Sequence, residues 1–466
     1  MEGQDSTRYG LVIAFTALAF LVLSSDFSLM SVALPSIEHD LALAPDTVSL
    51  IVAMNGMTFA GVLILGGRLA DQYGQFRCCI AGLACFAVGS TLSALAPGVV
   101  VLGAGRALQG LGAAVLSPAS FSLLNTALPP GAWQRRGYGV FATTQAAALI
   151  VGYLIGGAVT TALGWRAAFL INVPFTVIAA AVALYVVPRA AVDPQRGAPD
   201  LAGAILITAS VGLIVWTIST AASTGGLSLK SLAGLGAAAS TFIAFLVLES
   251  RLARPLLPLS IFLTRNLIGN DLAMVFCMAA GSGVFLLPNL YMQQVLGYSA
   301  AQSGLGMLPH AAGGMLSGRL LVIAMRRFQL RESILAGLAV FAAGLLLFYA
   351  LSVLLPHPGY LGVILAPLLL CACAALFCGM VLMAGGTTIV PAGQQGAASA
   401  LALTAQQIGL ALGSAVVLTV TGKAQAAGAT VVESLRAGFL TAAGLVVVSA
   451  LCILFATRAS GSAGQE

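Results

Sequence analysis

The 466-residue chain is 59% hydrophobic and only 7% charged, and its mean hydropathy is +1.03. A soluble domain carries about 25% charged residues and has too little interior to bury so much apolar surface. The formal net charge of +6 is spread too thinly for a nucleic-acid-binding surface. The 8 cysteines are scattered through apolar runs, unlike the framework of a secreted disulfide-rich protein. The composition therefore predicts an all-α integral membrane protein.

Apolar runs of the length that a membrane span needs, about 20 residues, recur along the chain. We count fourteen, at 10–34, 47–67, 78–96, 99–126, 137–162, 168–187, 201–220, 231–249, 267–295, 303–318, 333–354, 361–384, 397–420 and 437–457. The first is no cleaved signal peptide, because it is too long and contains the polar Ser24-Ser25-Asp26. With the N-terminus inside, 15 of the 20 basic residues fall on the cytoplasmic side. We therefore expect a multi-pass protein of the inner (plasma) membrane with both termini cytoplasmic.

Two parts of the chain resemble each other. Residues 81–89 (AGLACFAVG) are similar to residues 336–344 (AGLAVFAAG). Upstream of these two segments, the triplet 67–69 matches the triplet 318–320. Chance similarity between helices rich in Ala and Gly is the alternative. The ordered double match favours a duplicated six-helix unit, the build of secondary transporters. The predicted domains are a bundle in 1–187, two inserted membrane helices with their linker in 188–250, a cytoplasmic linker in 251–266, a second bundle in 267–457 and a cytoplasmic tail in 458–466.

Five short motifs occur in order along the chain. They are Asp26 with 32–35 (VALP), 67–77 (GRLADQYGQFR), 106–110 (RALQG), 165–174 (WRAAFLINVP), and 290–293 (LYMQ) with 297–299 (GYS). Together they resemble the major facilitator superfamily, specifically its fourteen-span drug:proton antiporter family, over nearly the whole chain. The resemblance implies the major facilitator fold, with two pseudo-symmetric six-helix bundles plus two inserted helices.

The chain departs from the family pattern at two places. The antiporter signature G-x-x-x-G-P-x-x-G-G reads ALIVGYLIGG at 148–157, so Tyr153 replaces the proline and removes the cause of a kink there. Gln72 and Gln75 stand where the family usually has Arg, which leaves fewer charges in that segment. Three small residues remain on one face of the fifth span: Gly152, Gly156 and Gly157. They would let helices approach closely and slide. The alternative is that these glycines face lipid.

The resemblance also implies that the segment after the second span is a loop that closes a cytoplasmic gate. Asp71, near Arg68 and Arg77, would hold the closed state through charge-assisted hydrogen bonds. Gly67 and Gly74 would permit close packing and a tight turn. A solvated loop charge is the alternative for Asp71.

A carboxylate and a guanidinium lie within the predicted spans. Asp26 is 9 positions before Pro35, which places it about 13 Å below the outer end of the first span, and Arg106 is 8 positions after Gly98, at nearly the same depth in the fourth. A lone ion at that depth is costly, so such residues face a cavity or each other. Equal depth predicts an Asp26–Arg106 ion pair that proton binding to Asp26 would dissolve. The alternative is a static pair that fixes helix packing.

Other polar residues are weaker candidates. His310 reaches a comparable depth in the tenth span and could be a second proton-coupling residue or a substrate contact, although a packing histidine is the alternative. Asp271 and Glu249, near the inner ends of their spans, are interpreted as interfacial charges. The candidates for the wall of a substrate cavity are Asn55, Phe59, Gln109, Gln145, Tyr291, Gln293 and Gln406.

The predicted function is secondary active export of hydrophobic or amphipathic small molecules, either drugs or a self-made metabolite, in exchange for protons by alternating access. No phosphate-binding loop and no metal-ligand spacing occurs, so we expect no cofactor and a proton gradient as the energy source. One proton suffices, because each 100 mV supplies about 2.3 kcal/mol, or a gradient of roughly 40-fold. The expected partners are the small-molecule substrate, protons and the lipid bilayer, for a monomer without nucleic acid. A transport-inactive membrane sensor, or a lipid-binding or lipid-exporting member of the same fold, is the alternative; no catalytic residue set suggests an enzyme.

Overall fold

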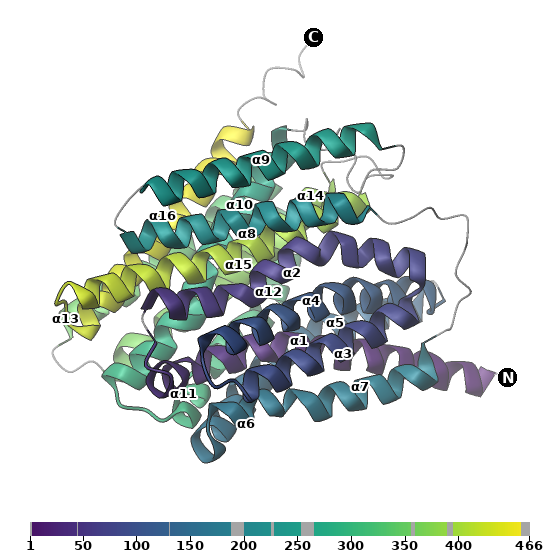
Figure 1. The fold of residues 1–466 in the computed structure, drawn as a ribbon, viewed down its shortest axis with the longest axis horizontal. Coiled ribbons are helices and arrows are strands. Elements are labelled where there is room, and N and C mark those ends of the chain that lie inside the picture. Colours follow the sequence, from purple (N-terminus) through teal and green to yellow (C-terminus); the bar gives the residue numbers. More distant parts are fainter. Residues whose placement is uncertain are drawn as a thin grey trace, which may run out of the picture. The chain divides into compact units, whose positions relative to one another are not determined.

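Helices make up the regular secondary structure of the computed structural model, which describes residues 2–43, 45–129, 131–187, 200–224, 228–252, 265–355, 359–388 and 395–457. The helices (Figure 1) are α1 (Glu2–Asp40), α2 (Pro45–Tyr73), α3 (Gln75–Ala94), α4 (Val99–Thr126), α5 (Ala132–Leu163), α6 (Trp165–Leu170), α7 (Asn172–Val186), α8 (Leu201–Thr224), α9 (Leu229–Arg251), α10 (Arg265–Leu290), the π-helix η2 (Tyr291–Val295), α11 (Ala300–Gly306), α12 (Leu308–Arg327), α13 (Leu330–Leu354), the π-helix η3 (Tyr360–Ile364), α14 (Leu365–Thr388), α15 (Gln395–Ala426) and α16 (Val431–Thr457).

The predicted apolar runs coincide with these helices, each run falling on one helix or on a consecutive pair. Ten helices among the described residues are long and apolar enough to cross a membrane. Shorter apolar segments lie within α2, α5 and α8, at Leu50–Leu63, Ala147–Leu163 and Ile205–Ile214. The chain is therefore a multi-pass membrane protein, and the count of fourteen spans stays a prediction.

Glycine and proline set three of the helix boundaries near the site. Gly74 separates α2 from α3 with φ 88°, and Gly164 separates α5 from α6 with φ 85°, a region that other residues rarely adopt. In a continuous helix, the ring of Pro174 would clash with the carbonyl of Leu170, four residues earlier. The helix α6 ends at that residue. The break at Ile171 makes Asn172 the first residue of α7.

The chain divides into two compact units. The first comprises Met1–Leu43, Met57–Thr208 and Ser299–Leu305, and the second comprises Ala44–Gly56, Ala209–Tyr298 and Gly306–Glu466. The predicted cytoplasmic tail and most of the predicted linker 251–266 lie outside the described residues. The predicted domain boundaries stay predictions.

The same helix pairings occur inside both units. In the first, α1 packs against α4, α5 and α7, and α3 packs against α4 and α7. In the second, α10 packs against α14, α15 and α16, and α13 packs against α14 and α16. A duplicated six-helix unit produces this pattern, with α10 in the place of α1 and α13 in the place of α3.

Glycine contacts align the two units residue by residue. Gly89 of α3 lies so close to Gly105 of α4 that a Cβ on it would be 2.7 Å from the Gly105 carbonyl oxygen. Its counterpart in the repeated segment is Gly344 of α13, where an added Cβ would be 2.6 Å from Cys371 Sγ of α14. The position of Gly105 in one unit therefore corresponds to that of Cys371 in the other.

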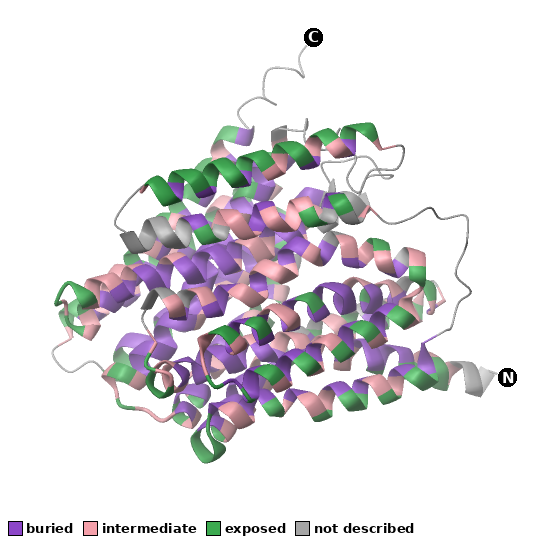
Figure 2. Cartoon of the chain, viewed as in Figure 1, coloured by how far each residue is buried: buried purple, intermediate pink, exposed green. Residues whose placement is uncertain are grey.

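Apolar side chains fill the first unit on the N-terminal side of Asp26. The core lies among α1, α3, α4 and α7 and includes Phe15, Leu83 and Leu116. In contrast, α9 exposes apolar side chains along most of its length (Figure 2), among them Leu232 and Ile243. An exposed apolar face of this kind is typical of contact with lipid.

Candidate proton-coupling site

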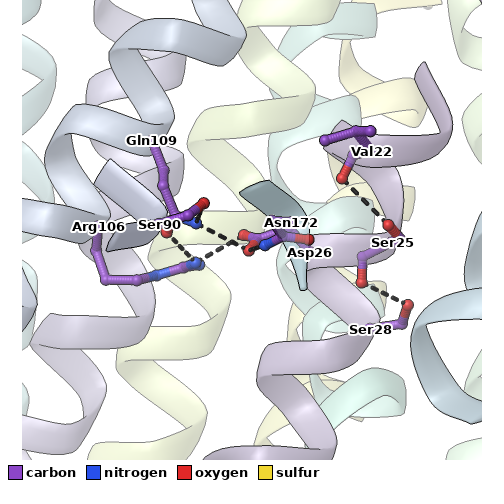
Figure 3. Close-up of polar contacts among 8 residues, drawn as sticks. All are labelled: Val22, Ser25, Asp26, Ser28, Ser90, Arg106, Gln109 and Asn172. Carbon is purple, nitrogen blue, oxygen red and sulfur yellow. Dashed lines mark hydrogen bonds and ion pairs between the residues drawn. The ribbon is translucent and has the colours of Figure 1, made fainter. Parts of the chain in front are cut away.

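A buried ion pair lies at the centre of the first unit. Arg106 Nη1 is 2.6 Å from Asp26 Oδ2, and the two side chains are only 1% and 3% exposed (Figure 3). The pair joins α1 to α4 directly, without a bridging water. The ion pair predicted from equal depth is therefore present in the structure.

The second carboxylate oxygen is held by two neutral amides. Asp26 Oδ1 accepts hydrogen bonds from Asn172 Nδ2 at 2.9 Å and from Gln109 Nε2 at 3.1 Å. Gln109 Nε2 also donates to Ser90 Oγ at 2.8 Å, and Gln109 Oε1 accepts from Arg106 Nη1 at 2.7 Å. The carboxylate is thereby tied to α4 and α7, and through Gln109 to α3, so its charge state affects four helices.

The guanidinium is less completely satisfied than the carboxylate. Arg106 lies over the ring of Phe169, with its Cζ 5.8 Å from the ring centroid, a cation–π contact. Its Nε is buried and has no hydrogen-bond partner among the described residues. Arg106 thus depends on Asp26 for its compensating charge, because a buried cation without a counter-ion is strongly unfavourable.

The local sequence of α1 keeps other hydroxyls out of this network. Ser25 Oγ donates to the Val22 carbonyl at 3.2 Å, and Ser28 Oγ donates to the Ser25 carbonyl at 3.0 Å (Figure 3). These bonds within the helix satisfy both side chains. Asp26, which lies between these two serines, reaches across to α4 and α7.

The arrangement stabilises a charged carboxylate through one ion pair and two amide hydrogen bonds. A proton on Asp26 would cancel the attraction to Arg106 and turn one acceptor oxygen into a donor, which the surrounding amide N–H groups cannot accept. The cluster can therefore respond to proton binding by separating α1 from α4. This response is the chemistry that the geometry supports.

The second unit has no such cluster at the corresponding places. Arg106 follows Gly105, and the residue that follows its counterpart Cys371 is the apolar Ala372. Glycines of α5 contact α1, and glycines of α15 contact α10 at matching positions. By this pairing, the position of Asp26 corresponds to that of Phe276 on α10. The duplicated framework is kept, but its charged pair occurs in one unit.

The glycines of α5 are in close contact with neighbouring helices, as predicted. A Cβ on Gly152 would collide with the Ser25 carbonyl oxygen of α1, and one on Gly156 would be 3.0 Å from Leu29 Cα. Gly157 faces α11, where a Cβ would be 2.6 Å from the Ala300 carbonyl oxygen. Tyr153, in place of the family proline, is fully buried. Gly152 therefore sets the distance between α5 and the part of α1 that carries Asp26.

We predict that Gly152→Ala destabilises the protein by about 1–3 kcal/mol, the usual cost of forcing extra volume into a packed interior. The matched control is Gly139→Ala on the same helix, where nothing lies within 4 Å of a new Cβ. The control should change stability by no more than about 0.5 kcal/mol. Thermal unfolding of both variants in detergent measures the difference, and equal effects would contradict the close contact.

The predicted gate loop is mostly helical, which corrects the expectation. α2 continues through Gly67, Arg68 and Asp71 to Tyr73, and it ends at Gly74, which has a positive φ. The predicted tight turn is present at Gly74. The predicted close packing at Gly67 is wrong, since a Cβ there would be 3.9 Å from Pro118, an ordinary contact.

The close contact lies one residue earlier, where a Cβ on Gly66 would collide with the Ala114 carbonyl oxygen. Arg68 and Arg77 have exposed side chains, and the side chain of Asp71 lies outside the described ones. Gln75 ties the start of α3 to the end of α4 through neutral hydrogen bonds from Nε2 to Ser122 Oγ at 2.8 Å and Thr126 Oγ1 at 2.9 Å. The role of this segment as a gate stays a prediction.

His310 belongs to the second unit rather than to the Asp26 cluster. It lies on α12, is 1% exposed, and its ring packs edge-on against Phe285 with centroids 4.4 Å apart. Its part in proton coupling stays a prediction.

The predicted cavity residues are spread over both units. Gln109 is 0% exposed and committed to the ion pair, so in this conformation it does not line a cavity wall, contrary to expectation. Phe59 packs against Val22 and Phe86, and Gln406 Nε2 is 3.8 Å from Met278 Sδ. Substrate contact stays a prediction for the other six residues. Tyr291 is buried, and the side chain of Gln145 lies outside the described ones. The half-buried residues are Asn55, Phe59, Gln293 and Gln406.

Two members of the network were missed by the sequence-based site. Asn172 lies in the motif at 165–174, which predicts no role for it, and no sequence pattern marks Ser90. The signal that could have found Asn172 is the following Pro174, which breaks the helix and starts α7 at a polar residue.

Comparison with known proteins agrees with the fold. Residues 16–414 match the family model described as Major Facilitator Superfamily. The chain is 38% identical over 419 residues to the cephamycin export protein CmcT of Amycolatopsis lactamdurans, covering 88% of this chain and 84% of that one. It is 32% identical to the puromycin resistance protein pur8 of Streptomyces alboniger, covering 91% and 84%, and 30% identical to the multidrug efflux pump LfrA of Mycolicibacterium smegmatis, covering 90% and 83%.

Among solved structures, a crystal structure of the peptide transporter POT in complex with sulfate superposes with a TM-score of 0.70, at 16% identity and covering 96% of this chain and 94% of that one. This likeness shows the fold. The family model spans most of the chain and the relatives align over nearly all of it. The chain belongs to the Major Facilitator Superfamily of membrane transporters.

Proposed function

We propose that the chain is a proton-coupled exporter of small molecules, in which Asp26 binds and releases the coupled proton. The observation that carries the proposal is the ion pair of Asp26 and Arg106, a charged group held inside an apolar helical unit with Asp26 only 3% exposed. Intramembrane carboxylates of this kind mark proton pathways in transporters. The names of the relatives support export as the direction of transport.

The energy of the pair is of the size that alternating access requires. Removing one partner of a buried ion pair costs about 3–5 kcal/mol. Reversing a two-state population from 1:99 to 99:1 takes about 5.5 kcal/mol. One proton on Asp26 would therefore supply most of the free energy that shifts the transporter between its inward-open and outward-open states.

The proposed topology follows the sequence pattern. Fourteen spans with both termini in the cytoplasm would place Asp26 nearer the outer surface, so a proton would enter from outside and leave to the cytoplasm. We propose that the protein acts as a monomer in the inner membrane, without a cofactor and without catalytic activity.

The proposed substrates are antibiotic-like molecules. Cephamycin and puromycin are named for two relatives, and a third is called a multidrug pump. Tyr153 packs fully inside the first unit in place of the family proline, which favours a stiffer helix and a narrower substrate range. A dedicated exporter of one compound class is therefore our preferred form of the proposal.

Transport into proteoliposomes tests this proposal. Vesicles with an acidic lumen and the purified protein should accumulate a cephamycin, puromycin or ethidium from outside, through those molecules whose cytoplasmic side faces outward. Protein-free vesicles with the same pH gradient are the control. Absence of proton-driven flux for every compound of a broad panel would contradict export and favour the membrane-sensor alternative.

A further inference from the structure

A second buried carboxylate lies in the other unit, on α10. Asp271 is 7% exposed, and both of its carboxylate oxygens are buried without a hydrogen-bond partner among the described residues. The sequence predicted an interfacial charge here, and the structure corrects this to a buried group. The contrast with Asp26, which receives three polar contacts, is complete.

The neighbouring amide compensates the carboxylate only in part. Asn270 favours the charged form of Asp271, but its Nδ2 donates to the Leu382 carbonyl of α14 at 2.9 Å. Gly385 and Gly386 hold this amide in place, since Cβ atoms on them would be 3.0 and 3.3 Å from Asn270 Oδ1 and Nδ2. The end of α14 thus holds the Asn270 amide on the Leu382 carbonyl.

No described cation reaches the carboxylate from the helices that pack against α10. Gly438 of α16 contacts Leu287, 16 residues after Asp271, so that end of α16 is about 24 Å away along the helix. The charged residues of α15 and α16 lie at that end or beyond it, and they are Lys423, Glu433 and Arg436. The titratable groups of α14, and the remaining one of α16, are thiols: Cys371, Cys373, Cys378 and Cys452.

Charged residues nearer to that end of α10 do not supply a counter-ion either. On α13, Arg331 and Glu332 are exposed, and Glu332 accepts a hydrogen bond from the Gln329 backbone at 3.2 Å. On α10 itself, Arg265 is the first residue and its side chain lies outside the described ones. The described surroundings of Asp271 are therefore neutral.

We propose that Asp271 is a second proton-binding residue, which carries its proton in this conformation and releases it to the cytoplasm when water reaches that end of α10. An ionised carboxylate without a partner is far more costly inside a membrane protein than the neutral acid. The carboxyl therefore keeps its proton until hydration stabilises the anion. The inference rests on the proposed function, and it raises the protons exchanged per cycle from one to two.

Infrared spectroscopy of the protein in lipid tests the protonation state without any transport. At neutral pH the wild type should show the carbonyl stretch of a protonated carboxylic acid, and D271N should lack it. The matched control is E433Q, which removes an exposed carboxylate from the same unit and should retain the band. Identical spectra for wild type and D271N would overturn the proposal.

Labelling of the wild type keeps the test independent of how D271N folds. Dicyclohexylcarbodiimide reacts with protonated carboxyls in apolar surroundings, so mass spectrometry should find the adduct on Asp271 and not on the ion-paired Asp26. An unlabelled Asp271 would overturn the proposal.

Transport then separates this inference from the proposed function. With a pH difference of one unit and no membrane potential, each coupled proton supports about a tenfold gradient. For puromycin, or for any probe that the wild type carries, the steady-state gradient should approach about 100-fold in wild type and about tenfold in D271N. If the substrate gradient reaches only about tenfold in both wild type and D271N, the second proton site is overturned and the exporter is not. If Asp271 is protonated but the protein shows no flux, the exporter is overturned and the second proton site is not.

Discussion

Replacing Asp26 with asparagine is expected to remove the part of pH-driven substrate accumulation that the proton on Asp26 couples. Asparagine keeps the volume of the side chain and its contacts with α4 and α7, but it cannot bind a proton or attract Arg106 as an anion. Under a pH difference of one unit, the loss of one coupled proton lowers the steady-state gradient by about tenfold. Uptake into acid-loaded proteoliposomes measures this loss, while binding of the substrate should persist.

The same substitution at Asp40, the last residue of α1, provides the control. Asp40 also forms an ion pair, with its Oδ2 2.5 Å from Arg166 Nη1, but both side chains are nearly half exposed. Exposed pairs contribute little, about 0–1 kcal/mol. Asp40→Asn should therefore leave the pH response intact. If Asp26→Asn pumps as well as the wild type, the coupling group lies elsewhere, and His310→Ala is the next variant to measure.

Depth along a span was readable from the sequence, whereas the direction of a side chain around the helix was not. The rise of 1.5 Å per residue is fixed, so counting from Pro35 and Gly98 was enough to place Asp26 and Arg106 together. Counting also placed Asp271 near the inner end of its span, but it could not show that the side chain is buried among helices. Burial at that level is decided by the packing of α10 against α14, which no single segment encodes.

Helix phase explains the other errors. Gly67 and Gly66 are adjacent in a glycine pair, but successive residues point about 100° apart on a helix, so Gly66 is in close contact with α4 whereas Gly67 makes only an ordinary contact with it. Gln109 is polar and lies in a span, and on that ground the sequence predicts a cavity residue. Its contacts with Asp26 and Ser90 come from α1 and α3, and they depend on tertiary packing rather than on local sequence.

The internal repeat explains why the charge cluster occurs once. Close glycine contacts recur in both units because they preserve helix spacing, as at Gly89 and Gly344. A buried pair costs desolvation energy, so it persists only where it has a use. The matching places of the second unit hold the apolar Phe276 and Ala372, so that unit packs without such a pair. This asymmetry favours a coupling role over a structural one.

Removing the guanidinium is expected to have the largest effect on stability. Arg106→Gln leaves Asp26 buried with its ion-pair partner gone, which costs about 3–5 kcal/mol. The measurement is thermal or denaturant unfolding of the purified protein in detergent. Lys230→Gln, which removes an exposed cation at the start of α9, is the control and should cost less than about 0.5 kcal/mol.

A double-mutant cycle with Asp26→Asn then decides between a static and a coupling pair. The double variant has no unpaired buried charge, so it should regain much of the stability lost in Arg106→Gln, with a coupling energy of at least about 1.5 kcal/mol. Additive effects would contradict the ion pair. If the pair only fixes packing, the restabilised double variant should also regain its full pH response. If Asp26 carries a proton, stability returns and the tenfold share of the gradient that Asp26 couples stays lost.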